Sequence, residues 1–212
     1  MKGEIDNQSS LLRWQGSQRR IGITGGIASG KSSVGEYLKE IKGLPILDAD
    51  VFAHEALAPG AKATMTVIER YGNTVQNKTT CLTPTINRSK LSKIIFSNPK
   101  ERLWIEKVIH PLVRQRLKKE LTANKNAPVI ALIIPLLFEA KLTQLCSEIW
   151  VVNCSQAQQC KRLMKRDGLT DYEAKARVKA QWPLQDKLRL ADVVIDNNRG
   201  LQAWLKDVDK LC

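Results

Sequence analysis

An α/β fold in three layers, with helices on both sides of a five-stranded parallel sheet, is the architecture that this sequence predicts. Short apolar runs of strand length alternate with longer segments in which apolar residues recur every three or four positions, as in strand–helix–strand units. The 212 residues suffice for one such domain with insertions. The predicted strands are residues 20–24, 46–47, 129–134, 149–153 and 193–195.

The connection between the first strand and the first helix carries the strongest signal. It reads Gly25-Gly26-Ile27-Ala28-Ser29-Gly30-Lys31-Ser32, which has the spacing G-x-x-x-x-G-K-[ST]. Glycine lets backbone N–H groups approach phosphate oxygens, and the helix that follows adds its positive N-terminal end. Lys31 can then reach the β- and γ-phosphates, and the Ser32 hydroxyl can hold Mg²⁺. The motif predicts a fold of the P-loop NTPase type that binds a nucleoside triphosphate; the alternative is a turn that only joins a strand to a helix.

Two carboxylates follow the second strand. Ile46-Leu47 leads directly into Asp48-Ala49-Asp50, and because side chains alternate along a strand, both Asp side chains should point the same way. Ligands of open parallel sheets bind outside the carboxyl ends of the strands. We therefore expect Asp48 and Asp50 beside the phosphate loop with catalytic roles. The alternative is an acidic strand end at which Asp50 caps the next helix.

The segment between the second and third strands is longer than a simple crossover helix needs. Its pattern is largely helical, and Asn98-Pro99 predicts a helix that begins with an N-cap and a proline at the first helical position. Pro111 predicts a break or kink after His110. We expect a helical insertion over about residues 51–127 that can hold a second substrate. Taken in isolation, His110 has the character of a structural residue.

The third strand does not end as in many phosphate-loop proteins. Residues 129–134 form an almost unbroken apolar run, as a strand buried on both faces requires. Such a strand often ends in an Asp linked to magnesium. Here it continues into Pro135-Leu136-Leu137-Phe138-Glu139, so that role has to be filled elsewhere or through water.

A basic helical pair follows the fourth strand. Arg162 and Arg166 stand four residues apart on one predicted helix, and Thr170-Asp171-Tyr172-Glu173 starts a second helix with a capping box. Two helices joined by a turn and rich in arginine suit a lid, here about residues 156–190, that closes on ATP and screens phosphate charge. The alternative is a charged, solvated surface.

Composition narrows the class of protein. A net charge of +13 is compatible with a protein that binds either nucleic acid or small polyanions such as ATP. The lack of aromatic residues among the basic runs favours small polyanions.

The five cysteines show no C-x-x-C spacing, which indicates neither a disulfide framework nor zinc. No stretch has the length of a membrane span and the start is unlike a signal peptide, so we expect a cytoplasmic protein. Residues 1–18 lack periodicity and predict a mobile tail.

Two classes of phosphate-loop protein are disfavoured. A GTPase needs N-K-x-D, and neither Asn77-Lys78-Thr79-Thr80 nor Asn124-Lys125-Asn126-Ala127 supplies the Asp. A motor usually needs an apolar strand that ends in acidic residues, which Ile134-Pro135 does not provide. An acid pair after the second strand, a helical insertion and an arginine-rich lid together favour a nucleoside or nucleotide kinase.

The chain resembles the bacterial dephospho-CoA kinase family from about Arg20 to its C-terminus. The D-A-D, H-P-L and I-P-L-L-F-E stretches are distinctive, whereas the phosphate loop is generic. Members of this family also lack an acidic end on the third strand, and they usually begin near Arg20, so residues 1–18 depart from the pattern. The matching stretches are residues 24–32, 47–50, 109–113, 134–139, 161–167 and 194–197.

The resemblance implies transfer of the γ-phosphoryl group of ATP to the ribose 3′-hydroxyl of dephospho-CoA, which gives coenzyme A, with Mg²⁺ as cofactor. It implies that Asp50 is the base that orients the hydroxyl, and that Arg162 and Arg166 neutralise charge as the lid closes. His110 would belong to the acceptor-binding region. The expected catalytic residues are Asp50, Lys31 and Arg166. The expected ATP-binding residues are Gly25, Gly26, Ala28, Ser29, Gly30, Lys31, Ser32, Ser33 and Arg162, and the expected metal-binding residues are Ser32 and, through water, Asp48.

ATP and dephospho-CoA are the expected partners, with no nucleic acid and no membrane, for a monomer or weak homo-oligomer. We expect a single kinase domain of residues 19–212, whose core covers about 19–50, 128–155 and 191–212. The alternative is another phosphate-loop nucleoside or nucleotide kinase, and a further alternative is a basic, ATP-dependent nucleic-acid-binding protein.

Overall fold

The chain divides into two compact units. The first contains the chain up to Asp48 and from Asn124 onward, and the second is Ala49–Ala123. The computed structural model describes residues 12–77, 83–199 and 201–211. Among these residues, no helix is long and apolar enough to cross a membrane.

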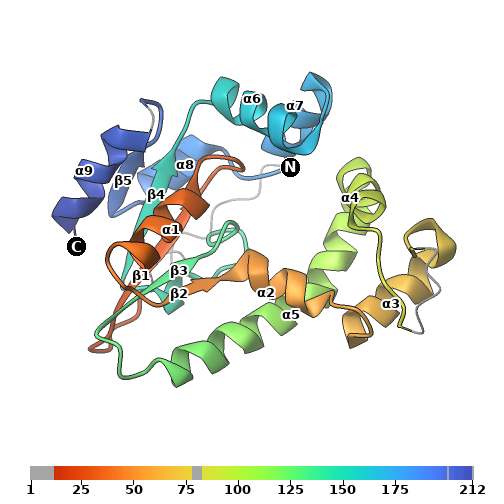
Figure 1. Cartoon of the computed structure of the whole chain (residues 1–212), viewed down its shortest axis with the longest axis horizontal. Helices are drawn as coiled ribbons and strands as arrows, with labels where there is room; N and C mark the ends of the chain where they lie inside the picture. The colour runs from red at the N-terminus through yellow and green to blue at the C-terminus, as the bar shows by residue number, and fades with distance from the viewer. Residues whose placement is uncertain (1–11, 78–82, 200, 212) are drawn as a thin grey trace. The chain divides into compact units, whose positions relative to one another are not determined.

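A five-stranded sheet in which every strand pair is parallel forms the centre of the first unit, which confirms the predicted sheet (Figure 1). The strand order is β2-β3-β1-β4-β5. In chain order the strands are β1 (Arg19–Gly25), β2 (Ile46–Asp48), β3 (Val129–Ile133), β4 (Glu148–Asn153) and β5 (Val193–Asp196).

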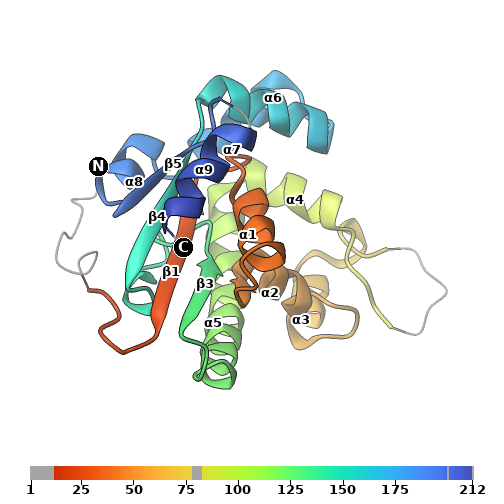
Figure 2. The ribbon, with the colours of Figure 1, turned by 60° about the vertical axis from the view of Figure 1, so that its left-hand side comes forward.

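The central strands β1, β3 and β4 are buried on both faces, which explains why they read as nearly unbroken apolar runs. On one face the sheet packs against α1 (Lys31–Glu40) and α9 (Leu201–Leu211), through fully buried side chains that include Val34 and Trp204. Leu132 of β3 and Val151 of β4 are also fully buried. Helix α8 (Leu184–Arg189) packs against β4 (Figure 2). Helices therefore cover both sides, in the three layers that the sequence predicts.

The central position of β1 determines where its following loop lies. Gly25, the last residue of β1, pairs with Val152 of β4, and Ile23 pairs with Ile133 of β3. The carboxyl ends of the three strands therefore meet at one edge of the sheet. In open parallel sheets this edge is where ligands bind.

Two further helices of the first unit form a hairpin, which we call the α6–α7 hairpin. Helix α6 (Gln156–Asp167) begins at its N-cap Ser155, and α7 (Asp171–Lys179) begins at Thr170 with the capping box that the sequence predicts. The apolar cluster between the two helices consists of Cys160, Leu163 and Ala174.

The segment before β1 is attached to the sheet. The Trp14 backbone N–H donates to the Cys146 carbonyl at 2.9 Å, and the Arg20 guanidinium lies over the Trp14 ring, 3.5 Å from its centroid. Gln18 is buried and its side-chain amide donates to two carbonyls of the loop before β3. The end of the expected tail is therefore packed and not loose, while residues 1–11 lie outside the described residues.

The second unit is helical, as the sequence predicts for this region. Its apolar core consists of Val67, Val75, Ile86, Leu91 and Ile105. Its elements are α2 (Ala49–Ala56), α3 (Lys62–Tyr71), the 3₁₀ turn η1 (Gly72–Thr74), α4 (Arg88–Ser97) and α5 (Pro99–Ala123). The first unit also has a 3₁₀ turn, η2 (Thr143–Leu145).

The long helix α5 confirms one prediction and contradicts another. It begins at Pro99, and Asn98 Oδ1 accepts the Lys100 N–H at 3.0 Å, as the N-cap pattern predicts. Of the predicted break or kink after His110, the break is wrong, because α5 continues through Pro111 to Ala123, while helical continuity does not contradict a kink. Proline removes one helical hydrogen bond, but buried residues on both sides, such as Ile105 and Val113, keep the helix packed.

A polar cluster joins α3 to α5 within the second unit. Arg70 donates to both carboxylate oxygens of Glu101, at 2.8 and 3.0 Å, and the Tyr71 hydroxyl donates to the same carboxylate. The Arg70 guanidinium also lies 4.5 Å from the centroid of the Trp104 ring. The hydrogen bonds from Arg70 and then from Tyr71 lower the pKa of Glu101 from its ordinary 4.5 to about 2.

Candidate active site

The loop between β1 and α1 has the backbone shape of a phosphate cradle. Gly25, Ala28 and Gly30 all have positive φ, at 147°, 57° and 103°. A Cβ on Gly25 would lie 2.6 Å from the Val152 carbonyl oxygen, and one on Gly30 would collide with the Asn197 amide. Only glycine fits these two positions. Gly30 is also the N-cap of α1 and makes no side-chain cap hydrogen bond, so no side chain competes there for the first N–H groups of the helix.

Lys31 lies across this loop. Its side chain is almost fully buried, at 8% exposure, and Nζ donates to the carbonyls of Gly25 at 3.3 Å and Gly26 at 2.8 Å. Ser32 and Ser33 follow in the first turn of α1, with Ser32 exposed and Ser33 half-buried. An ammonium group, a helix N-terminus and inward-facing glycines thus meet in one loop, which is a binding site for polyphosphate.

Side chains from other elements bind two carbonyl groups of the loop, those of Ala28 and Ser29. Asn197, which follows β5, donates from Nδ2 to the Ser29 carbonyl at 2.7 Å. The Arg162 guanidinium donates to the carbonyls of Ala28 and Ser29, each at 3.2 Å, and to the Asn197 carbonyl at 3.3 Å. The structure therefore places Arg162 against the loop backbone, and adds Asn197, which the sequence reading did not single out.

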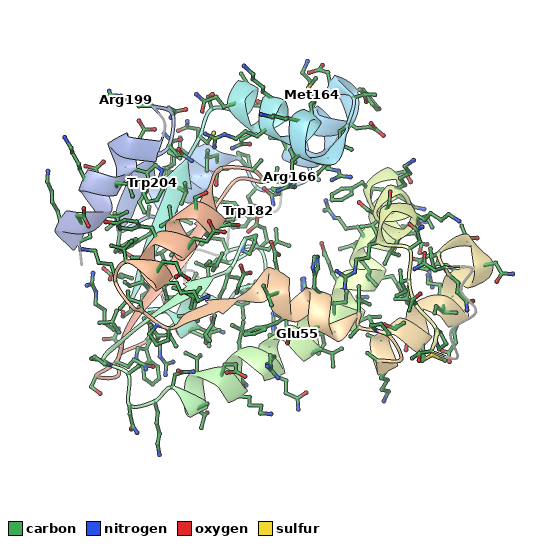
Figure 3. All side chains as sticks on the ribbon, viewed as in Figure 1. Glu55, Met164, Arg166, Trp182, Arg199 and Trp204 are labelled. Atoms are coloured by element: carbon green, nitrogen blue, oxygen red, sulfur yellow. The ribbon has the colours of Figure 1, made fainter. Side chains whose placement is uncertain are left out.

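Arg166 lies one turn further along α6, at the exposed end of the hairpin (Figure 3). It donates to the Asp167 carboxylate at 2.7 and 3.0 Å, and Arg177 of α7 donates to the same carboxylate at 2.9 Å. The hydrogen bonds from Arg166 lower the pKa of Asp167. Arg177 was not predicted, because it meets Arg166 only through the fold of the hairpin and no spacing rule joins the two.

The acid pair is placed differently from the prediction. Asp48 is the last residue of β2, but Asp50 lies in the first turn of α2, which begins at Ala49. The argument from strand alternation is therefore wrong, because the chain changes from extended to helical between the two carboxylates. Asp48 belongs to the first unit, whereas Asp50 is exposed and belongs to the second unit.

The segment after β3 lacks the magnesium-linked Asp that is common at this place in phosphate-loop proteins, and it contains a buried ion pair between Glu139 and Lys187. The Lys187 side chain is fully buried, at 0% exposure, and its Nζ donates to Glu139 Oε1 at 2.7 Å and to the Pro135 carbonyl at 3.2 Å. The Thr24 hydroxyl donates to the same Pro135 carbonyl at 3.1 Å. Sequence reading missed Lys187, because a lysine on a charged helix ordinarily faces solvent.

An open groove of about 580 Å³ runs along α5 in the second unit. His110 lies in it, and burial lowers the pKa of His110 below its ordinary value. Three cationic side chains, Lys107, Arg114 and Lys118, line the groove against the single carboxylate of Glu106, so it favours an anionic occupant. The lining residues are Leu103, Glu106, Lys107, His110, Pro111, Arg114, Gln115 and Lys118.

This fold and this loop define the class: a phosphate-loop phosphotransferase that takes a nucleoside triphosphate as its donor. The family within that class is equally clear. The chain belongs to the dephospho-CoA kinase family, whose model matches residues 19–203.

Individual relatives agree with this assignment. A dephospho-CoA kinase from Prochlorococcus marinus is 53% identical over 200 residues, which cover 94% of this chain and 98% of the relative. One from a Synechococcus species is 54% identical over 188 residues, with 89% of each chain covered.

Solved structures are similar as well. A crystal structure of a Thermus thermophilus protein has a TM-score of 0.74 at 31% identity and covers 92% of this chain and 97% of its own. A dephospho-CoA kinase from Campylobacter jejuni has a TM-score of 0.60 at 25% identity, with 91% and 96% covered. A shikimate kinase from Acinetobacter baumannii, with a TM-score of 0.50 at 16% identity and coverage of 92% and 93%, shares the fold alone.

Proposed function

We propose that this protein transfers the γ-phosphoryl group of ATP to the ribose 3′-hydroxyl of dephospho-CoA and so produces coenzyme A. The observation that carries the proposal is the phosphate cradle with Lys31 across it, in a chain that belongs to the dephospho-CoA kinase family. The loop accounts for the donor, and the family accounts for the acceptor.

On the donor side, the loop binds the triphosphate. The N–H groups of Gly30, Lys31, Ser32 and Ser33 stand at the start of α1 and hold phosphate oxygens. Lys31 moves its Nζ from the loop carbonyls to the β- and γ-phosphates, where its charge offsets the charge that spreads over the transferred group. Its near-complete burial keeps the ammonium in a place of low dielectric, where that interaction is stronger than in water.

The residues at the loop also fit Mg²⁺. This ion keeps several waters, binds phosphate oxygens and needs only one or two protein ligands, so the Ser32 hydroxyl with Asp48 acting through water is a sufficient donor set. Glu139 is not among these ligands, because its carboxylate pairs with the buried Lys187. When bound, Mg²⁺ supplies neutralisation of the β- and γ-phosphate charge.

On the acceptor side, Asp50 orients the ribose hydroxyl and accepts its proton. Its place in the first turn of α2 and its exposure leave the carboxylate accessible to a substrate. The basic groove on α5, with His110, Lys107 and Arg114, suits the phosphate groups of a nucleotide acceptor. On the α6–α7 hairpin of the first unit, Arg166 neutralises phosphate charge of the donor, and Asp167 orients its guanidinium.

An acceptor panel tests the activity. ATP and Mg²⁺ are supplied with dephospho-CoA, with adenosine and guanosine monophosphates, or with shikimate, and products are identified by mass. We expect one added phosphate on dephospho-CoA and little on the others. Phosphorylation of another acceptor in preference to dephospho-CoA would contradict the proposal, as would salt-sensitive DNA binding with no acceptor phosphorylated.

A variant tests the role of Asp50. Asp50→Asn should lower kcat by at least about a hundredfold, because a positioned base contributes on that scale, while the Kd for ATP stays within about threefold. Glu55→Gln is the control, since Glu55 is an exposed carboxylate on the same helix (Figure 3). Wild-type turnover in Asp50→Asn would refute the role given to Asp50.

A further inference from the structure

The segment that joins α7 to α8 holds the tip of the phosphate loop. The backbone N–H of Ile27 donates to Oε1 of Gln181 at 2.7 Å, between residues 154 positions apart. The side chains of Ile27 and Ala28 pack against the apolar cluster of the α6–α7 hairpin, which includes Leu163 and Ala174. The tip of the loop is therefore part of the base of the hairpin.

The residue at this tip has an unfavourable backbone conformation. Ala28 has φ of +57°, in the left-handed region that non-glycine residues rarely adopt. Such a conformation persists only when surrounding contacts hold it. The contacts bracket Ala28: Gln181 binds the N–H of Ile27 before it, and Arg162 binds the carbonyls of Ala28 and Ser29 after it.

Gln181 is itself fixed by the residue that follows it. The Trp182 N–H donates to Glu139 Oε1 at 3.2 Å. The Trp182 ring, labelled in Figure 3, stacks on Phe138 with centroids 6.2 Å apart and planes 2° from parallel. These contacts tie the α7–α8 connection to the segment after β3, beside the ion pair of Glu139 and Lys187.

The contacts form a closed ring with the phosphate loop. Thr24, just before the loop, and Lys187 both donate to the Pro135 carbonyl, and Lys187 also pairs with Glu139. Glu139 holds Trp182, whose neighbour Gln181 returns to the loop at Ile27. The ion pair and the ring stack join the α7–α8 connection to the segment after β3, whereas the hydrogen bond of Gln181 is the contact that reaches the backbone of the phosphate loop itself.

We propose that Gln181 is a positioning residue for ATP binding: it holds Ile27 so that Ala28 keeps its left-handed conformation and the loop N–H groups face the triphosphate. Gln181 acts through the loop backbone. Without its acceptor, Ala28 relaxes to a common backbone conformation and the N–H groups turn out of alignment. The inference rests on the proposed function in one respect, namely that ATP is the ligand of this loop.

The first test replaces the acceptor with a side chain of similar length. Gln181→Met should raise the KM for ATP and the Kd for ATP by about tenfold, the worth of one lost hydrogen bond in the cradle. The KM for dephospho-CoA should stay within about twofold of wild type, because the acceptor does not use this loop. The Kd is measured by calorimetry with ATP and Mg²⁺ alone, and the KM values by product formation.

Gln18→Met is the matched control. Gln18 is a buried glutamine whose amide donates to the carbonyls of Asn124 at 2.8 Å and Ala127 at 2.9 Å. It precedes β1, whereas the phosphate loop follows β1. Gln18 Oε1 also accepts from Arg20 Nε at 2.9 Å. The control therefore loses more side-chain hydrogen bonds than Gln181→Met does, and we expect a lower melting temperature with an unchanged Kd for ATP.

A second variant tests the strain argument. Glycine adopts positive φ without penalty, so in an Ala28→Gly background the effect of Gln181→Met on the Kd for ATP should shrink to about threefold or less. An equal effect in both backgrounds would overturn the inference. So would a Gln181→Met protein with unchanged Kd, or one in which both KM values rise together.

The two proposals can fail separately. If wild type binds ATP but phosphorylates no dephospho-CoA, the proposed function fails while the ATP measurements still decide the role of Gln181. If wild type phosphorylates dephospho-CoA and Gln181→Met binds ATP normally, only the positioning role fails. A wild-type protein without ATP affinity would overturn both.

Discussion

Replacing Lys187 with methionine should destabilise the protein strongly, although the substitution is nearly isosteric. Lys187 has 0% exposure and its partner Glu139 has 17%, with 2.7 Å between Nζ and Oε1. The substitution removes this pair and the bond to the Pro135 carbonyl, and it leaves a carboxylate that is mostly desolvated. Breaking a buried pair from one side costs about 3–5 kcal/mol. At about 2–4 °C per kcal/mol for a chain of this size, the melting temperature should fall by roughly 6–20 °C.

Two further variants make this expectation refutable. Lys175→Met removes an exposed pair with Asp171, where the side chains are 60% and 57% exposed, so it should lower the melting temperature far less than Lys187→Met does. The double variant Lys187→Met/Glu139→Met removes both buried charges and should recover at least about half of the loss. Thermal unfolding followed by circular dichroism measures all three. The reasoning would be refuted if Lys187→Met were no less stable than Lys175→Met. It would also be refuted if the double variant lost as much melting temperature as Lys187→Met alone, or more.

Two other changes have clear expected outcomes. Gly30→Ala needs φ of +103° and a Cβ that collides with Asn197, so ATP binding should weaken by at least about tenfold. Gly43→Ala, with φ of +65° and open space around it, should leave ATP binding unchanged by calorimetry. Glu101, whose pKa is lowered to about 2, stabilises the folded state above pH 4.5, and this contribution is lost as the pH falls towards 2. Glu101→Gln should therefore flatten the fall in urea midpoint over that range, and an unchanged slope would contradict the assignment.

The fold was predictable where the signal is local. Residues 129–134 are apolar because β3 is buried on both faces, and the capping box at Thr170 and the N-cap at Asn98 identify two helix starts from their own residues. Local rules failed where tertiary packing decides. Pro111 lies inside α5, although it was expected to interrupt the helix. Asp50 does not follow the strand alternation expected after Ile46-Leu47, because α2 begins at Ala49.

One part of the candidate site could likewise be predicted from the sequence, and another part could not. The phosphate loop from Gly25 to Ser32 could be predicted because its binding residues are consecutive in the sequence. Its supports are not: Asn197 and Gln181 reach the loop across 168 and 154 positions, and Lys187 reaches Pro135 across 52. Each of these side chains is ordinary in its own sequence neighbourhood. Only the folded chain brings the amide groups of Asn197 and Gln181 to the loop backbone, and Lys187 to the segment after β3.

The helical unit is inserted between two neighbouring strands of the sheet, and this connection limits what could replace it. The chain leaves at the carboxyl end of β2 and returns at the amino end of β3, and these two strands are parallel neighbours. Any substitute for Ala49–Ala123 must therefore span the length of a strand, about 16 Å for the five residues of β3. A tight turn cannot do so. A replacement for this unit is therefore a whole crossover segment of at least that span, while β1, the phosphate loop and α1 lie outside it.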